Sequence, residues 1–269
     1  MLAESGEEAR LFAGGTALML AMRQRMLTPS HVVYLGGVPG LNRIEFDERN
    51  GLRIGALALH IDVADSEIVK QRYPVIAGMA AHVANPQVRN QGTIGGNLCY
   101  GDPATDPPGC LMAHAARVRV VGPQGERTIE LDDFFTDYYQ TALEPNEVVT
   151  EIQVPAPAAD SKGAYTRFLR TPAEHRPLVS VAVVARRSGK LCREVRIIVG
   201  ASVPIPTRVR RAEQFLEGKS ITREVLEEAA AIAAADLEPV SDFRGSADYR
   251  REMIRTVVRR TAAKVFDHE

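Results

Sequence analysis

The sequence predicts an α+β protein in two parts, and three observations support this class. Short β-branched runs alternate with amphipathic stretches through the first half of the chain. A proline pair, Pro155-Ala156-Pro157, then interrupts it. Beyond this break, strand-like runs precede helix-like segments. We expect a first domain over 1–157, followed by a C-terminal domain over 163–269.

The first domain begins with a pattern typical of a β-α-β unit. A strand ends at Ala13, a turn follows at Gly14-Gly15, and the spacing predicts a helix over 16–25 and a strand over 32–35. The remaining elements are predicted in this order: a strand over 52–56, a helix over 60–70, a helix from Pro74, an irregular segment over 89–108, a hairpin of strands 118–121 and 128–131, and a strand over 148–154.

The sequence predicts that the C-terminal domain is a β-meander followed by helices. Strands are predicted over 164–170, 179–186 and 195–201, and helices over 210–217, 223–236 and 247–266. Thr222 and Ser246 are suited to cap the second and third of these helices. The last helix carries a stripe of Tyr249, Met253, Val257, Thr261 and Val265. Its arginines are expected on the polar face, as contacts with another protein or with solvent: Arg250, Arg251, Arg255 and Arg259.

Composition excludes several classes of protein. The 269 residues are 45% hydrophobic and 25% charged, which is ordinary for a globular chain that can bury a sizeable core. Thirty-three basic residues balance 34 acidic ones, so no basic footprint for nucleic acid is present. The longest uncharged apolar stretches, 11–22 and 197–207, are too short to form a transmembrane segment, and the first ten residues contain no apolar signal core. We therefore expect a cytoplasmic protein.

The chain offers no metal site and no catalytic group of its own. Its three cysteines form no CxxC pair and cannot ligate an iron–sulfur cluster alone. Cys110 and His114 are spaced to share a helix face, but two ligands make a poor metal site, and a buried thiol beside an ordinary histidine is the simpler interpretation. No nucleophile–base pair is apparent. Redox chemistry would therefore require a bound cofactor.

Two loops with paired glycines are the candidate binding elements, Ala13-Gly14-Gly15-Thr16-Ala17 and Thr93-Ile94-Gly95-Gly96-Asn97. Glycine permits positive φ and close approach to a ligand, and successive N–H groups in such turns form a nest for anionic oxygens. Two nests would suit a pyrophosphate, although a single Gly-Gly turn is more often structural. Gly95→Glu is expected to abolish retention of such a ligand by filling the nest. Among the residues that follow, Asp102 is best read as an Asx turn, and Asp106 could bind a sugar hydroxyl.

Three segments resemble a known protein family: AGGTAL at 13–18, NPQVRNQGTIGGNLCYGDPATDPP at 85–108 and TALEPNEVVTEIQVP at 141–155. The sequence is similar to the FAD-binding medium subunit of molybdenum hydroxylases, the xanthine dehydrogenase and carbon monoxide dehydrogenase family. The resemblance implies a two-lobed FAD-binding fold of the vanillyl-alcohol oxidase and p-cresol methylhydroxylase type, with a small α/β lobe at 1–36 and a larger mixed lobe at 37–157. A β-meander and three-helix domain is appended to it. The resemblance further implies a strand and helix before the first loop, where this sequence has about a dozen residues.

The resemblance also implies the cofactor contacts. The pyrophosphate-binding loops of the family match Ala13, Gly14, Gly15, Thr16 and Ala17, and Thr93, Ile94, Gly95, Gly96 and Asn97. Asp106 matches the aspartate on the cofactor's hydroxyls, Val83 a backbone contact near the adenine, and Leu143 an apolar contact. Arg167 stands where the family carries a lysine, and a planar guanidinium does not reproduce ammonium geometry. His175 and Pro177 lie where the family often places an aromatic ring against the flavin.

The implied function is that of a FAD-carrying electron-transfer subunit. Electrons would come from iron–sulfur clusters on a small partner subunit, after substrate is hydroxylated at a molybdenum cofactor on a large partner subunit. A dimer of heterotrimers is the expected assembly. A stand-alone flavoprotein oxidoreductase, or an assembly subunit with vestigial flavin loops, are the alternatives. Carbon monoxide, purines, aldehydes and N-heterocycles all stay open as substrates, as do NAD, quinone and oxygen as acceptors.

Overall fold

A computed structural model describes residues 8–189 and 191–267. These residues form two compact units. The first unit comprises the described residues up to Gly101 together with Ala116–Ala156. The second comprises Asp102–Ala115 and the described residues from Pro157 onward. None of the helices in the described residues is long and apolar enough to cross a membrane.

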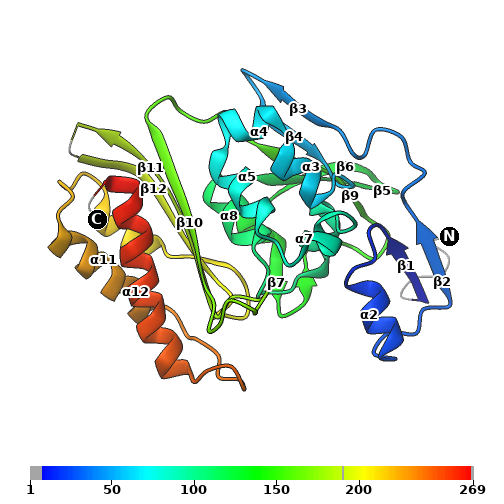
Figure 1. The fold of residues 1–269 in the computed structure, drawn as a ribbon. Helices are drawn as coiled ribbons and strands as arrows, with labels where there is room; N and C mark the ends of the chain where they lie inside the picture. Colours follow the sequence, from blue (N-terminus) through cyan, green and yellow to red (C-terminus); the bar gives the residue numbers. More distant parts are fainter. Residues whose placement is uncertain (1–7, 190, 268–269) are drawn as a thin grey trace. The chain divides into compact units, whose positions relative to one another are not determined.

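The first unit contains an antiparallel sheet with strand order β3-β4-β9-β5-β6, a parallel pair of strands β1-β2, and a set of short helices (Figure 1). Its elements in chain order are β1 (Ala9–Phe12), α2 (Leu18–Arg23), β2 (His31–Tyr34), β3 (Ile44–Asp47), β4 (Gly51–Gly55), α3 (His60–Asp65), α4 (Glu67–Arg72), α5 (Pro74–Ala81), α6 (Pro86–Arg89), α7 (Ile94–Tyr100), β5 (Arg117–Gly122), β6 (Gly125–Glu130), α9 (Leu131–Phe134), β7 (Phe135–Asp137), β8 (Gln140–Thr141) and β9 (Val148–Val154).

The β-α-β unit and the hairpin expected from the sequence are confirmed. Strands β1 and β2 pair in parallel around α2, and β5 pairs with β6 across the turn between Gly122 and Gly125. Helix α2 is shorter than predicted, because Arg25 adopts a positive φ of 56° that ends it. Strand β3 was not predicted, although its alternating apolar and charged residues, of which only the apolar ones are partly buried, are typical of a half-buried strand.

Two predictions about the helices of this unit are wrong. The helix predicted over 60–70 is two helices, α3 and α4, because Ser66 has a ψ of 119° and breaks the chain between them. The segment predicted to be irregular over 89–108 contains α7. Thr93 caps this helix by accepting a hydrogen bond at its hydroxyl oxygen from the Gly96 N–H at 3.1 Å. The capping residue outweighs the poor helix propensity of the glycines that follow it.

The second unit contains a sheet of order β10-β11-β12-β13 with helices on both of its faces. The meander is confirmed, and a short strand, β13, extends it at one edge. Helix α12 packs on β10 and β11 (Figure 1). Helix α10 packs on β12. The elements are α8 (Pro107–Ala113), β10 (Ser161–Phe168), β11 (Val179–Ser188), β12 (Leu191–Gly200), β13 (Thr207–Arg208), α10 (Arg210–Leu216), α11 (Arg223–Asp236) and α12 (Ala247–Phe266).

Successive side chains along the strands of this unit point to opposite faces of the sheet, and each face packs against different helices. Val179, Val181 and Val183 of β11 belong to the apolar cluster shared with α10, α11 and α12. Ile198 of β12 points the other way, toward α8, where a Cβ at Gly109 would lie 3.8 Å from its side chain. Residues 102–115 therefore join the second unit through their packing, although they precede the proline pair in sequence.

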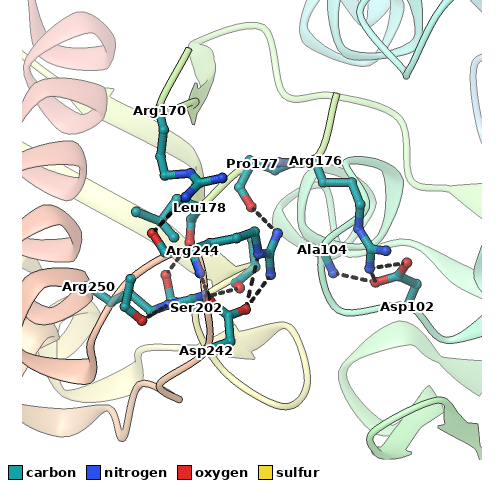
Figure 2. A network of polar contacts seen from close by, with 12 residues as sticks. Asp102, Ala104, Arg170, Arg176, Pro177, Leu178, Ser202, Asp242, Arg244 and Arg250 are labelled. Carbon is teal, nitrogen blue, oxygen red and sulfur yellow. Dashed lines mark hydrogen bonds and ion pairs between the residues drawn. The ribbon is translucent and has the colours of Figure 1, made fainter. Parts of the chain in front are cut away.

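Arg250 corrects the expectation that the arginines of the last helix lie on its polar face. Its side chain is fully buried, and it donates from Nη1 to the Ala201 carbonyl at 2.9 Å. Its other terminal nitrogen lies 2.6 Å from Asp242 Oδ1, and Arg244 binds the second oxygen of the same carboxylate at 3.0 Å (Figure 2). Arg244 also reaches the Pro177 carbonyl at 3.5 Å. Arg250 is therefore a structural residue that ties α12 to two loops.

Candidate functional site

The first glycine loop presents unused backbone donors. It joins β1 to α2, and within the described residues the N–H groups of Ala13, Gly14, Gly15, Thr16 and Ala17 donate no hydrogen bond. Gly15 has a φ of +70°, and a Cβ on it would lie 2.4 Å from the Phe12 ring, so only glycine fits there. The loop therefore has the unpaired N–H groups that a nest for an anion requires, and the nest stays a prediction.

The second loop differs, and the prediction that it too offers free N–H groups is wrong. Ile94 N donates to the Ala58 carbonyl and Gly95 N to the Ala56 carbonyl, both at 2.9 Å. Gly96 N and Asn97 N donate to the Thr93 hydroxyl and carbonyl oxygens. Within the described residues, the buried Oδ1 of the Asn97 side chain in this loop has no hydrogen-bond partner.

The two loops border one cavity of about 640 Å³ inside the first unit. A cavity of this size is large enough for a drug-sized or dinucleotide-like ligand. Most of the residues predicted from the sequence line it: Ala13, Gly14, Gly15, Thr16, Ala17, Thr93, Gly95, Gly96, Asn97 and Leu143. Ile94 and Val83 do not line it, and both are buried in the surrounding protein.

Gly95 has a packing role that the sequence did not indicate. A Cβ built on it would lie 2.6 Å from the Ala56 Cβ and 2.7 Å from the Ala56 carbonyl oxygen. The missing side chain thus lets α7 lie directly against the segment that follows β4. Gly95→Glu would disrupt this packing, rather than fill a nest as the sequence suggested.

Gly95→Ala is therefore expected to lower the free energy of unfolding by roughly 1–3 kcal/mol, because backbone atoms must move to accept the new methyl group. Gly78→Ala is the matched control. Gly78 lies within α5, and a Cβ there has nothing within 4 Å, so this substitution should leave stability unchanged or raise it by roughly 0.5–1 kcal/mol. Urea unfolding of the two variants measures the difference. Equal stability of the two variants would contradict the packing role.

An ion pair positions Leu143 in the cavity wall. Glu147 accepts two hydrogen bonds from Arg127, at 2.6 and 2.7 Å, and a third from the Glu144 N–H at 2.8 Å. Arg127 also donates to the Ala142 carbonyl at 2.8 Å, so one guanidinium holds both ends of this turn. Hydrogen bonds from Arg127 outweigh burial and lower the pKa of Glu147, which keeps the carboxylate charged.

Asp106 and Arg167, also predicted from the sequence, lie together in the second unit. Asp106 Oδ1 accepts a hydrogen bond from the Tyr165 hydroxyl at 2.6 Å and lies 3.5 Å from Arg167 Nε. Burial, followed by the Asp106 charge, raises the pKa of Tyr165 well above its usual value, so this phenol stays protonated. The interpretation of Asp102 as an Asx turn is confirmed by its hydrogen bond from Ala104 N at 2.9 Å, and Arg176 binds the same carboxylate (Figure 2).

Sequence reasoning missed several residues of the cavity wall. His60, Tyr100 and Tyr139 line it, yet none stands in a glycine motif. The two tyrosine rings meet edge to face with centroids 5.2 Å apart. Tyr139 has a φ of 58° in the turn between β7 and β8, which no local pattern predicts. Among the described residues, no group of three or more His, Cys, Asp or Glu side chains could hold a metal ion.

Two family models match the chain, and together they cover most of it. Residues 1–157 match the FAD binding domain in molybdopterin dehydrogenase, and residues 164–265 match the CO dehydrogenase flavoprotein C-terminal domain. The chain belongs to this flavoprotein family. The predicted two-lobed FAD-binding fold with an appended sheet-and-helix part is thereby confirmed.

Individual relatives in this flavoprotein family agree over nearly the whole chain. The sequence is 38% identical to the carbon monoxide dehydrogenase medium chain of Hydrogenophaga pseudoflava, over 97% of this chain and 90% of that one. It is 36% identical to the nicotine 6-hydroxylase medium subunit of Paenarthrobacter nicotinovorans, with the same coverage. The solved carbon monoxide dehydrogenase from Hydrogenophaga pseudoflava superposes with a TM-score of 0.96 over 99% of this chain and 92% of that chain.

The chain is therefore the FAD-carrying, electron-transferring subunit of a multi-subunit molybdenum hydroxylase, and it is an oxidoreductase component. The cavity fits FAD by its own chemistry. It combines free N–H donors for a pyrophosphate, the Asn97 Oδ1 without a partner among the described residues, and apolar side chains such as Leu11, Leu35 and Leu57.

Proposed function

We propose that the cavity of the first unit holds FAD with its pyrophosphate on the loop of residues 13–17. The free N–H groups of this loop support the assignment, because oxygens of a diphosphate satisfy several such donors at once. Thr93 fixes the second loop, so that Gly96 and Asn97 face the same cavity. Leu143 contributes an apolar contact that excludes water from the bound cofactor.

When bound, FAD accepts electrons from a donor centre and passes them to an acceptor. The residues of this chain bind and orient the cofactor, and none is assigned an acid or base role. In the second unit, Asp106 is proposed to accept hydrogen bonds from cofactor hydroxyls, with Tyr165 and Arg167 fixing its carboxylate. Val83 is proposed to act through its backbone carbonyl, to which Arg89 also donates at 2.9 Å.

The finer organisation is also a proposal. The FAD-binding domain would span 1–157, with lobes at 1–36 and 37–157, and the C-terminal domain 163–269. The ranges of the two family models support this division, although residues 1–7 lie outside the described part of the chain. The proposed partners are a small iron–sulfur subunit and a large molybdenum-cofactor subunit, in a cytoplasmic dimer of heterotrimers. The relatives' names, medium chain and medium subunit, support such an assembly.

An affinity-tagged copy of the chain expressed in its native cells tests the assembly. We expect two further subunits to co-purify, with iron–sulfur absorbance and with molybdenum detectable by metal analysis. Light scattering would then give the mass of a dimer of heterotrimers. Purification of the chain by itself as a catalytically complete flavoprotein would favour the stand-alone alternative. A folded chain that takes up no FAD, alone or in its complex, would favour the assembly role.

A further inference from the structure

His60 is a buried polar residue in the cavity wall that no glycine motif contains. It is the first residue of α3, its exposed fraction is 2%, and it lines the cavity. Its backbone N–H donates to the Gly92 carbonyl at 3.0 Å, and an isolated bridge pairs Leu59 with Thr93. The start of α3 is therefore attached to the start of the second glycine loop.

The Nδ1 atom of His60 is buried and makes no hydrogen bond in the described part of the chain. Two other histidines contrast with it, because Nδ1 of His82 lies 2.7 Å from the Gly78 carbonyl oxygen and Nδ1 of His114 lies 2.9 Å from that of Cys110. A buried polar atom without a partner is uncommon and destabilising, and one in a cavity wall points to a ligand.

The imidazole also borders the loop that has free N–H groups. A Cβ built on Gly92 would lie 3.2 Å from His60 Cδ2 and 3.3 Å from Thr16 Oγ1. The His60 ring and the Thr16 side chain thus flank the same glycine. An anionic group bound by the N–H groups of the first loop would therefore lie near the Cδ2 edge of this ring.

We propose that His60 is a further cofactor-binding residue, which donates a hydrogen bond from its imidazole N–H to a pyrophosphate oxygen of FAD. The inference rests on the proposed placement of FAD. Burial, with a smaller contribution from the nearby charge of Arg89, lowers the pKa of His60 to about 4. The ring is therefore neutral at pH 7 and donates one N–H without leaving an uncompensated charge when the cavity holds no anion.

Two substitutions at this position separate binding from folding. His60→Leu removes the donor at similar volume, whereas His60→Asn keeps an N–H near the position of Nδ1. We expect His60→Leu to weaken binding of both FAD and ADP by about 10- to 100-fold, and His60→Asn to stay within about threefold of the original chain. ADP carries the diphosphate without the flavin. Affinities are measured on the chain as it purifies, with its partner subunits where these accompany it.

The melting temperature without ligand separates a binding role from a structural one. If His60 only stabilised the fold, His60→Leu would lower this temperature. His60→Leu removes a buried polar atom without a partner, so its melting temperature should be unchanged or higher, while the shift produced by FAD becomes smaller. His82→Leu, at an exposed histidine outside the cavity, is the control and should alter neither value. A His60→Leu chain that melts lower and binds ADP normally would overturn the proposal.

A second measurement, of the ¹⁵N chemical shifts of the histidine rings, is made on the original chain. In the original chain labelled with ¹⁵N at histidine, saturation with ADP should shift the His60 ring nitrogens, with the signal assigned from its absence in His60→Asn. Unchanged His60 nitrogens at saturation would overturn the proposal. If Thr16→Asp abolishes ADP binding while His60→Leu does not, only the role of His60 fails. If neither variant changes ADP binding, the proposed FAD placement fails as well.

Discussion

Replacing Thr16 by aspartate is expected to weaken FAD binding about a hundredfold, while replacement by asparagine leaves it within about fivefold. The two introduced side chains have nearly the same size and differ in charge. Thr16 lies in the loop whose N–H groups have no acceptor within the described residues, and it lines the cavity. A carboxylate there repels a pyrophosphate and also competes for the same N–H donors.

The magnitude follows from simple electrostatics. Two unit charges about 4 Å apart at an effective dielectric constant near 20 interact by about 4 kcal/mol, and solvent at this exposed side chain reduces that value. Flavin fluorescence titration at low and high salt measures it. The gap between the aspartate and asparagine variants should narrow as salt increases, because ions screen the repulsion. Equal FAD affinity of the two variants would show that the loop does not face the pyrophosphate.

Arg250→Met should be the most destabilising single change in the second unit. It removes a fully buried guanidinium that donates to the Ala201 carbonyl and pairs with Asp242 (Figure 2). Breaking a buried pair by removing one partner costs about 3–5 kcal/mol, because the other groups stay buried without compensation. The melting temperature should fall by roughly 10 °C or more.

Arg255→Met is the matched control on the same helix. Arg255 is exposed, so its replacement should change the free energy of unfolding by no more than about 0.5 kcal/mol. Calorimetry of the two variants and the original chain gives the comparison. Similar small losses in both variants would mean that the Arg250 network contributes little to stability.

Acid should reduce the difference in stability between the original chain and Arg250→Met. Burial by itself would raise the pKa of Asp242, but hydrogen bonds from Arg250 and Arg244 outweigh it and lower the pKa from 3.8 to about 2. The stabilisation is therefore complete above the unfolded value and is lost as the pH falls through about 2. The gap in melting temperature between the original chain and Arg250→Met should shrink between pH 5 and pH 2. A gap that stays constant over this range would assign the effect of Arg250 to packing alone.

Elements whose signals are local could be predicted closely. Helices α11 and α12 have the bounds that the sequence predicted, and each begins where it does because Thr222 or Ser246 accepts a hydrogen bond from the N–H three positions on. Strand β9 likewise matches its β-branched run. In each case the interactions that define the helix or strand lie within a few residues of one another, so a short stretch of sequence is enough to predict it.

The binding loops could be predicted for the same reason, but which of their N–H groups are free to bind a ligand could not. Paired glycines mark both loops, whereas the availability of their N–H groups depends on carbonyls elsewhere in the chain. Ala56 and Ala58 accept the hydrogen bonds of Gly95 and Ile94 from almost forty positions away in sequence, and nothing comparable meets the first loop within the described residues. His60 joins the cavity wall through the Gly92 carbonyl, which no spacing rule predicts.

Arg250 shows the same difference between what local sequence predicts and what the tertiary structure decides. Helical periodicity identified the helix and its apolar stripe, and the sequence by itself determined the family, the two-part α+β fold and the glycine loops. Periodicity does not distinguish a buried arginine from an exposed one, because the partners of Arg250, the Ala201 carbonyl and the Asp242 carboxylate, come from other segments of the chain. Only the tertiary structure decided which polar groups are paired, since long-range hydrogen bonds form between residues that the sequence keeps apart.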